Sequence, residues 1–393
     1  MAKPKKNTEP EIKDNDPLVV NEATEKALDD IFDLIEKNNP DAATLSENSL
    51  SNVSGYIDTG NYSLNAIISG SVYGGIPFGR VCGFFGPPAT GKTLIINKII
   101  ANAQHMGMRP IYFDSEQALD KQVAMRLGCD VTKIKHIPVE IIEECRNQSF
   151  QILTQLIERG IKKKIIIAID SIGALNTAKE LNDTLESKNA SDMGLKAKQL
   201  KSMLLKLTYR AAKTETPVLF TNHIYESIGD MYPSMVKKQS GGMSPLFIAS
   251  LLVQLSTTHI KSADDKGQIG KLSDKISGAN LRAFITKNRF VPPYLSTEMY
   301  LNFKTGLDKY SGLLSLALNM GLIEQTGSVY LLNGTKLGYA STFEKDAEFW
   351  ENGPLKELDT LLKKELTYSN ENYSDLKTEV EKLDKEILND TEV

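Results

Sequence analysis

Short apolar runs alternate with longer helical patterns through the middle of the chain. The apolar runs predict strands at 79–86, 109–116, 133–139, 162–171, 217–223, 250–258 and 281–288. An apolar stretch at 93–107 and an amphipathic one at 143–160 predict helices between them. Apolar strands that alternate with helices are typical of a parallel sheet, and the closer spacing of the later strands predicts an antiparallel edge. The expected fold class is therefore α/β, with a mostly parallel central sheet flanked by helices.

The two ends of the chain have a different pattern. Residues 1–20 are charged and lack an apolar run, so we expect them to be disordered. Residues 22–40 predict an amphipathic helix that ends before Pro40, and a Ser/Asn-rich linker follows at 46–54. Near the other end, a helical stripe under an acidic cover is formed by Leu376, Val380, Leu383 and Ile387.

Charge and composition narrow the possible partners and the cellular compartment. Residues 1–50 carry 6 Lys and 12 Asp/Glu (net −6), and residues 370–393 carry 3 Lys and 8 Asp/Glu (net −5). With a net charge of −4 overall, the middle is therefore −4 + 6 + 5 = +7, which suits a polyanion partner, although charged ends can also simply aid solubility. The chain has no signal-peptide pattern and no membrane-length apolar run, and its three cysteines lack disulfide or zinc spacing. We expect a cytoplasmic protein with no membrane partner.

A glycine-rich turn joins the first predicted strand to its helix. The stretch "GPPATGKT" has the spacing of a phosphate-binding loop, in which backbone N–H groups and a helix N-terminus face phosphate oxygens. Lys92 is expected to reach the β- and γ-phosphates of ATP, and Thr93 to bind Mg²⁺. The predicted nucleotide-binding residues here are Gly86, Pro87, Pro88, Ala89, Thr90, Gly91, Lys92 and Thr93.

Three further polar residues follow buried strands, where ligands of parallel sheets bind. Asp170 is a candidate magnesium ligand, or else caps a turn. Glu116 is a candidate base for the attacking water, or else an ordinary surface residue. His223 is a candidate sensor of the γ-phosphate, or else a solvated histidine. His105, His136 and His259 have no such placement, and we assign them no site role.

A basic helix and a long loop suggest contact with single-stranded nucleic acid. The helix that begins near residue 194 carries Lys196, Lys198 and Lys201, each of which could also be a solvated surface charge. A glycine-containing loop at about 225–242 offers cations and wedges for bases, and loops of this length in compact domains usually have a function. The candidate DNA-binding residues are Met193, Lys196, Lys198, Tyr225, Ile228, Tyr232, Lys237, Lys238, Gly241 and Gly242.

Seven segments in this order resemble the RecA recombinase family, and within it the UvsX-like phage recombinases. They are "IDTGNYSLNAIISGSVYGGIPFGRVCGFFGPPATGKT", "FDSEQALD", "IIIAIDSIGAL", "SDMGLKAKQLKSMLLKL", "TNHIYESIGDMYPSMVKKQSGGM", "KNRFVPPY" and "YSGLLSLALNMGLIEQTGSVY". The resemblance runs from about residue 56 to 340. It implies a RecA-like P-loop ATPase core with DNA loops at 56–300. The remaining predicted domains are 1–55 (N-terminal helix, linker and polymerisation segment), 301–365 (a small helical or α/β subdomain) and 366–393 (an acidic amphipathic tail).

The resemblance also implies roles for single residues. Glu116 matches the catalytic glutamate, and His223 matches the γ-phosphate sensor, which is Gln in bacterial members. Lys287 and Arg289 match two cations that reach the ATP of a neighbouring protomer. The other matches are Asp120 and Tyr310 near the adenine, and Met193 as an insertion between bases. Two departures stand out: Val123 replaces an aromatic residue that stacks on the base, and Tyr225 replaces an Arg.

Together these matches imply an ATP- and Mg²⁺-dependent DNA strand-exchange recombinase. Such a protein forms filaments on single-stranded DNA, pairs it with homologous duplex, and works with a mediator or loader and a single-strand-binding protein. A RecA-fold motor such as a hexameric helicase is one alternative, but only about 55 residues precede the predicted core. A non-catalytic mediator that binds ATP as a scaffold is another, and intact Lys92, Glu116 and Asp170 argue against it.

Overall fold

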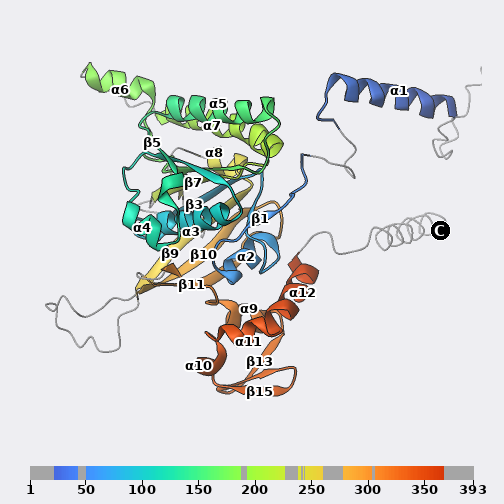
Figure 1. Ribbon diagram of the computed structural model, residues 1–393, viewed down its shortest axis with the longest axis vertical. Coiled ribbons are helices and arrows are strands. Elements are labelled where there is room, and N and C mark those ends of the chain that lie inside the picture. The colour runs from blue at the N-terminus through green and yellow to red at the C-terminus, as the bar shows by residue number, and fades with distance from the viewer. Residues whose placement is uncertain are drawn as a thin grey trace, which may run out of the picture. The chain divides into compact units, whose positions relative to one another are not determined.

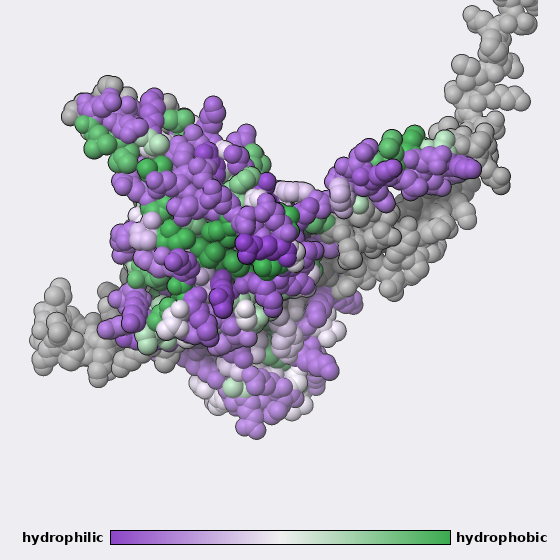
Figure 2. All heavy atoms as spheres, turned by 45° about the horizontal axis from the view of Figure 1, so that its top comes forward, coloured by the Kyte–Doolittle hydropathy of each residue, from purple (hydrophilic) through white to green (hydrophobic). Residues whose placement is uncertain are grey.

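The computed structural model describes residues 22–42, 50–186, 193–225, 238–239, 242, 244–259, 278–302 and 306–366. The chain forms two compact units, residues 1–52 and 53–393. In the first unit, the predicted amphipathic helix is confirmed as α1 (Glu22–Asn38). Figure 2 shows hydrophobic side chains among hydrophilic ones along this helix. Its exposed large hydrophobic residues are Leu28, Ile31, Phe32, Leu34 and Ile35.

The second unit is built on a ten-stranded sheet among the described residues (Figure 1). Its parallel strands, in spatial order, are β9 (Leu251–His259), β3 (Val81–Gly86), β7 (Val218–Tyr225), β6 (Ile165–Asp170), β4 (Arg109–Asp114) and β5 (Lys135–Pro138). Next to β9 lie the antiparallel strands β10 (Gly278–Asn288), β11 (Ser296–Asn302) and β12 (Gly306–Leu307). The predicted parallel sheet with an antiparallel edge is confirmed.

Helices cover both faces of this sheet. One face packs against α2 (Tyr62–Ser69) and α3 (Lys92–His105), and the other against α5 (Ile142–Glu158) and α7 (Met193–Thr214). Neighbouring residues of one strand face opposite helical layers, as Phe84 and Phe85 do in β3. Burial on both faces explains why the central strands β3 and β6 are almost entirely apolar. None of the described helices is long and apolar enough to cross a membrane.

Shorter elements complete this unit. They are β1 (Tyr56–Ile57), β2 (Ile76–Pro77), α4 (Lys121–Arg126), the 3₁₀ turn η1 (Val131–Lys133), α6 (Ala178–Leu185), β8 (Lys238–Gln239) and α8 (Ser244–Ile248). β8 pairs antiparallel with the end of β7. It therefore holds the chain beside β7 again after residues 226–237, which lie outside the described residues.

The C-terminal region mixes helices with a small sheet. Its elements are α9 (Leu313–Asn319), β13 (Ile323–Thr326), β14 (Val329–Leu332), β15 (Thr335–Gly338), α10 (Ala340–Phe343), α11 (Ala347–Glu351) and α12 (Pro354–Leu366). Of the two alternatives expected for this region, helical or α/β, the structure has the α/β one, with short strands that are mostly half-buried or exposed. Buried Trp350 and Phe343 pack in one cluster with Tyr62 of α2. The stripe at 376–387 lies outside the described residues, and the domain boundaries stay predictions.

Candidate active site

The predicted phosphate-binding loop joins β3 to α3 with an unusual backbone. Ala89 and Gly91 have positive φ angles of 61° and 78°, a conformation that turns the chain sharply. At Gly86 a side chain would be impossible, because a Cβ atom would lie 2.4 Å from the carbonyl oxygen of Leu255. The 14-residue helix α3 begins directly after Gly91. The partial positive charge at its N-terminus therefore lies at the loop and favours an anion there.

Lys92 is folded over this loop. Its Nζ donates hydrogen bonds to the carbonyl oxygens of Gly86 (3.0 Å) and Pro87 (2.8 Å). Burial lowers the pKa of the Lys92 amine, and the carboxylates of Asp170 and Glu116 act in the opposite direction. A buried amine beside two carboxylates is well placed to bind negatively charged phosphate oxygens.

A cavity of about 450 Å³ lies over the loop and unites candidates from four strand ends. Its lining includes Lys92, Thr93, Glu116, Asp170 and His223. The other lining residues are Pro88, Ala89, Thr90, Gly91, Leu94, Ala279, Leu281 and Leu301. The carboxyl ends of β3, β4, β6 and β7 meet at this edge of the sheet because the four strands run parallel. The functional roles of Lys92, Thr93, Glu116, Asp170 and His223 remain predictions.

Asp170 is the centre of a buried hydrogen-bond network. Its Oδ2 accepts bonds from the hydroxyls of Thr93 (2.7 Å) and Tyr112 (2.7 Å), and its Oδ1 accepts one from Thr221. Burial raises the pKa of Tyr112, and the Asp170 charge raises it further, so the phenol stays a donor. Carboxylate and hydroxyl oxygens are suitable Mg²⁺ ligands, so Asp170 and Thr93 fit this ion. The described residues contain no group of three or more His, Cys, Asp or Glu that could hold a metal alone, which is usual where phosphates and water complete the shell.

Glu116 is held between Ser171 and His223. Its Oε1 lies 2.5 Å from the donating hydroxyl of Ser171 and 2.6 Å from Nε2 of His223. Burial tends to raise the pKa of the Glu116 carboxyl, but these hydrogen bonds and the charges of His223 and Lys92 outweigh it. The net effect lowers its pKa, so the side chain is a carboxylate at neutral pH and can accept a proton.

The two residues expected near an adenine base lie elsewhere in the described structure. Asp120 caps α4 by accepting a hydrogen bond from the N–H of Val123 (2.8 Å). Tyr310 donates to Glu351 (2.5 Å), and its ring packs edge-on against Tyr62 at 5.6 Å between centroids. Neither residue is among those that line the phosphate-loop cavity. Their contact with a base stays a prediction.

Lys287 and Arg289 lie at the opposite edge of the sheet from the phosphate loop. Ala279 at the start of β10 lines the cavity, whereas Lys287 near its end pairs with Leu252 at the start of β9. Leu281, the cavity-lining residue of β10 nearest to Lys287 along the strand, is six residues away, about 20 Å of extended chain, so the Lys287 amine lies away from the cavity of its own chain. Its Nζ donates to the carbonyl oxygens of Leu246 (2.6 Å) and Phe247 (2.7 Å) at the end of α8.

The lowered pKa of Lys287 allows a pH test of its predicted role in ATP hydrolysis. Burial lowers the pKa of its amine to about 8, and the nearby Arg289 charge acts in the same direction. A base with a lowered pKa loses its charge as pH rises through that value, whereas Arg stays charged. If the Lys287 charge supports ATP hydrolysis, the activity ratio of wild type to Lys287→Arg should fall as pH rises from about 7 to about 9. Steady-state hydrolysis across this range measures it, and a constant ratio contradicts it.

Most candidate DNA-binding residues fall outside what the structure describes. Ile228, Tyr232, Lys237 and Gly241 lie in undescribed positions, as do the side chains of Met193, Tyr225 and Lys238. In α7, Lys198 is exposed, but Nζ of Lys196 donates to the carbonyl oxygen of Gly173 (3.0 Å). Gly242 has a φ angle of 82°, which requires glycine-like freedom. The DNA contacts therefore stay predictions.

Three contacts of the site were not anticipated from the sequence. Tyr112 and Thr221 bind Asp170 from neighbouring strands, and Ser171 binds Glu116. Ser171 directly follows Asp170, so its position at a strand end was a usable signal. Tyr112 and Thr221 lie inside apolar runs, where a polar atom is normally buried against a partner, but the sequence does not say which.

A phosphate loop, a magnesium-type carboxylate and a poised glutamate on a parallel sheet define a P-loop ATPase. A family model described as the RecA N-terminal domain matches residues 26–308. The chain is 32% identical to Protein RecA of Cytophaga hutchinsonii over 284 residues, which are 72% of this chain and 74% of that protein. It is 30% identical to Protein RecA of Thermus thermophilus over 337 residues, 85% of this chain and 92% of that protein.

This chain belongs to the RecA family. The family consists of DNA recombination and repair proteins that act as DNA-dependent ATPases, use ATP with Mg²⁺ and form filaments on DNA.

Proposed function

We propose that this chain is a strand-exchange recombinase that assembles on single-stranded DNA, pairs it with a homologous duplex and hydrolyses ATP between subunits. The observation that carries the proposal is the 2.6 Å contact between Glu116 and His223 over the phosphate loop. His223 also lies in β7, the strand that leads into the candidate DNA-binding loop at about 225–242. One strand would therefore connect the proposed catalytic glutamate with the proposed DNA-binding segment.

In the proposed reaction, water attacks the γ-phosphorus of ATP while Glu116 accepts its proton, the bond to the β–γ bridging oxygen breaks, and ADP and inorganic phosphate are the products. Lys92 and the N–H groups at the start of α3 hold the phosphates, and Thr93 and Asp170 would hold Mg²⁺. The ion would neutralise charge on the phosphate oxygens when bound. Because its pKa is lowered, Glu116 is ionised before attack, and its contact with Ser171 fixes the carboxylate direction.

Completion of the site would need a second copy of the chain. Lys287 lies six residues, about 20 Å of extended chain, from the cavity-lining Leu281 of β10, and Arg289 follows the end of that strand, so neither would act within one chain. On a neighbouring protomer the same two cations can approach the γ-phosphate and stabilise charge in the transition state. This arrangement would make hydrolysis depend on assembly.

DNA binding would be linked to the nucleotide through β7. His223 pairs with Gly86 of the phosphate loop, and two residues later Tyr225 pairs with Lys238 of β8. Asn222 also donates to the side chain of Gln239 (3.2 Å). Both ends of the segment 226–237 are thus tied to the strand that carries the sensor, so a shift of His223 on γ-phosphate binding would move both loop ends.

We propose that the protein belongs to the UvsX-like phage branch, because His223 stands where bacterial members carry Gln and UvsX-like members carry His. It would act in recombination-dependent repair and replication in the cytoplasm of a phage-infected or prokaryotic cell. A mediator or loader and a single-strand-binding protein are the expected partners. The acidic tail at 366–393 would tune access of duplex DNA or of the loader.

Strand exchange between a circular single strand and a homologous linear duplex tests the proposal. We expect joint molecules that require ATP, Mg²⁺ and homology. A heterologous duplex of equal length is the control, because it keeps DNA binding but cannot pair. Absence of joint molecules at every ATP concentration, with ATP and single-strand binding intact, would rule out strand exchange and favour a motor or a mediator.

A further inference from the structure

Asp114 has a set of contacts that the proposed reaction does not yet use. It is the last residue of β4, its side chain is 2% exposed, and it lies two residues before Glu116. Its carboxylate accepts N–H bonds from Glu116 (3.2 Å), Ala118 (3.3 Å) and Leu119 (3.2 Å). One buried charge therefore binds the backbone on both sides of Gln117.

The turn that these hydrogen bonds hold, residues 115–119, contains a residue with an unfavourable backbone conformation. Gln117 has a φ angle of 55°, which costs a non-glycine residue free energy unless its surroundings fix it. Its side-chain Nε2 donates to the carbonyl oxygen of Asp114 at 3.3 Å. Ser115 on the other side is fixed to Ser171 in both directions, at 2.7 Å and 2.8 Å. The direction of the Glu116 side chain thus depends on anchors at Asp114 and Ser171.

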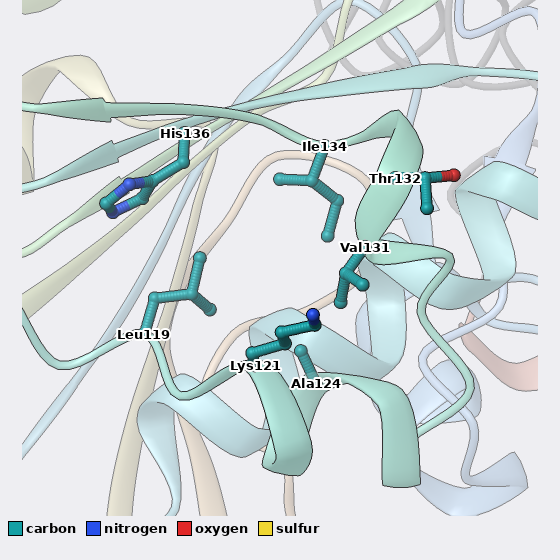
Figure 3. A pocket seen from close by; sticks show the side chains of 7 residues that line it. All are labelled: Leu119, Lys121, Ala124, Val131, Thr132, Ile134 and His136. Carbon is teal, nitrogen blue, oxygen red and sulfur yellow. The ribbon is translucent and has the colours of Figure 1, made fainter.

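His136 completes the shell around Asp114 from the neighbouring strand. Its Nε2 lies 3.0 Å from Oδ2 of Asp114, the oxygen that also accepts from Leu119. The side chain of His136 is 40% exposed and lies on the wall of a second cavity of about 400 Å³. Figure 3 shows His136 and Leu119 along one side of this cavity, with Thr132 across from them. Leu119, at the end of the turn that carries Glu116, and His136, which contacts Asp114, therefore line the same side of this cavity.

We propose that Asp114, oriented by His136, is a positioning residue that sets the Glu116 carboxylate for water activation. The inference rests on the proposed function, because it takes Glu116 as the base. A charged acceptor holds N–H donors more firmly than a neutral one, and Asp114 holds three of them. Loosening that anchor would let Glu116 drift while the phosphate loop, on another strand, keeps its shape.

Asp114→Asn keeps the shape of the side chain but removes its charge and one acceptor oxygen. We expect kcat for DNA-dependent hydrolysis to fall by about 10- to 100-fold, because small misplacements of a catalytic group have effects of this size. The KM for ATP and the affinity for a non-hydrolysable ATP analogue should stay within about twofold, since neither depends on proton transfer. A merely structural role would weaken nucleotide and DNA binding together with kcat.

Variants of His136 test the same proposal while leaving the buried Asp114 carboxylate in place. His136→Leu removes the donor and should lower kcat by about three- to tenfold, the scale of one ordinary lost hydrogen bond. His136→Gln places a donor at a similar reach and should restore most of the loss. Thr132→Ala lines the same cavity without a hydrogen bond to Asp114 and should behave as wild type. Should Asp114→Asn fail to fold, equal kcat in His136→Leu and Thr132→Ala would overturn the proposal.

A double-mutant cycle separates this inference from the proposed function. In single-turnover hydrolysis, Asp114→Asn should have little further effect in a Glu116→Gln background, because it acts through the same carboxylate. An equal loss in both backgrounds would refute positioning while leaving Glu116 as the base. Wild-type turnover by Glu116→Gln alone would instead refute the base assignment, and the positioning role with it.

Discussion

Glu116→Gln should lose ATP turnover by about 10²- to 10⁴-fold, the usual contribution of a general base. Gln keeps the shape and can still accept from Ser171, but it cannot take a proton from water. Affinity for ATP and single-stranded DNA should be nearly unchanged, because Lys92 and the loop N–H groups hold the phosphates. Steady-state hydrolysis, with filter binding for nucleotide and DNA, makes the comparison.

An exposed carboxylate supplies the control for this variant. Glu144→Gln on α5 makes the same chemical change at an exposed position. It should hydrolyse ATP at the wild-type rate. If Glu116→Gln also retains wild-type turnover, Glu116 is not the base. If it instead loses ATP binding, its contribution is structural.

Lys287→Ala/Arg289→Ala should lower hydrolysis by about 10³-fold or more, the scale seen when a cation supplied by another subunit is removed from phosphoryl transfer. Binding of ATP to the isolated protomer should persist, because both residues lie far from the phosphate loop of their own chain. Hydrolysis in the presence of saturating single-stranded DNA gives the rate, and equilibrium dialysis without DNA gives the affinity.

Two outcomes would count against this interpretation. Full hydrolysis by the double variant would mean that the cations do not act on ATP. Loss of ATP affinity in the isolated protomer would mean that they act within one chain. Lys356→Ala on α12, which also removes an exposed cation but lies outside the candidate ATP and DNA sites, controls for a general loss of positive charge.

The sequence predicted which polar side chains meet at the phosphate loop, because strand direction alone brings them together. Each of these side chains lies at or just after the end of an apolar run: Lys92, Glu116, Asp170 and His223. Parallel strands bring such ends together. The antiparallel edge also followed from the short spacing of the later strands. These features depend only on local pattern and chain order.

Contacts that depend on register or on weak local patterns were not predictable. Tyr112 and His136 look like strand residues, and only the pairing of β4 with β5 and β6 places them near Asp114 and Asp170. The small strands β13 to β15 are half-exposed, so their pattern resembles that of the neighbouring helices. Tyr310 was assigned by resemblance alone, and its contacts with Tyr62 and Glu351 depend on how the C-terminal region packs.

The proposed ATP site takes its glutamate from one chain and its cations from another, both assembled on DNA. Mixing Glu116→Gln subunits with Lys287→Ala/Arg289→Ala subunits on single-stranded DNA tests whether the two halves complement each other. With random assembly of equal amounts, about one interface in four joins an intact glutamate to intact cations, so hydrolysis should recover to about a quarter of the wild-type rate. No recovery above the separate variants, in filaments shown to contain both, would contradict a site shared between subunits.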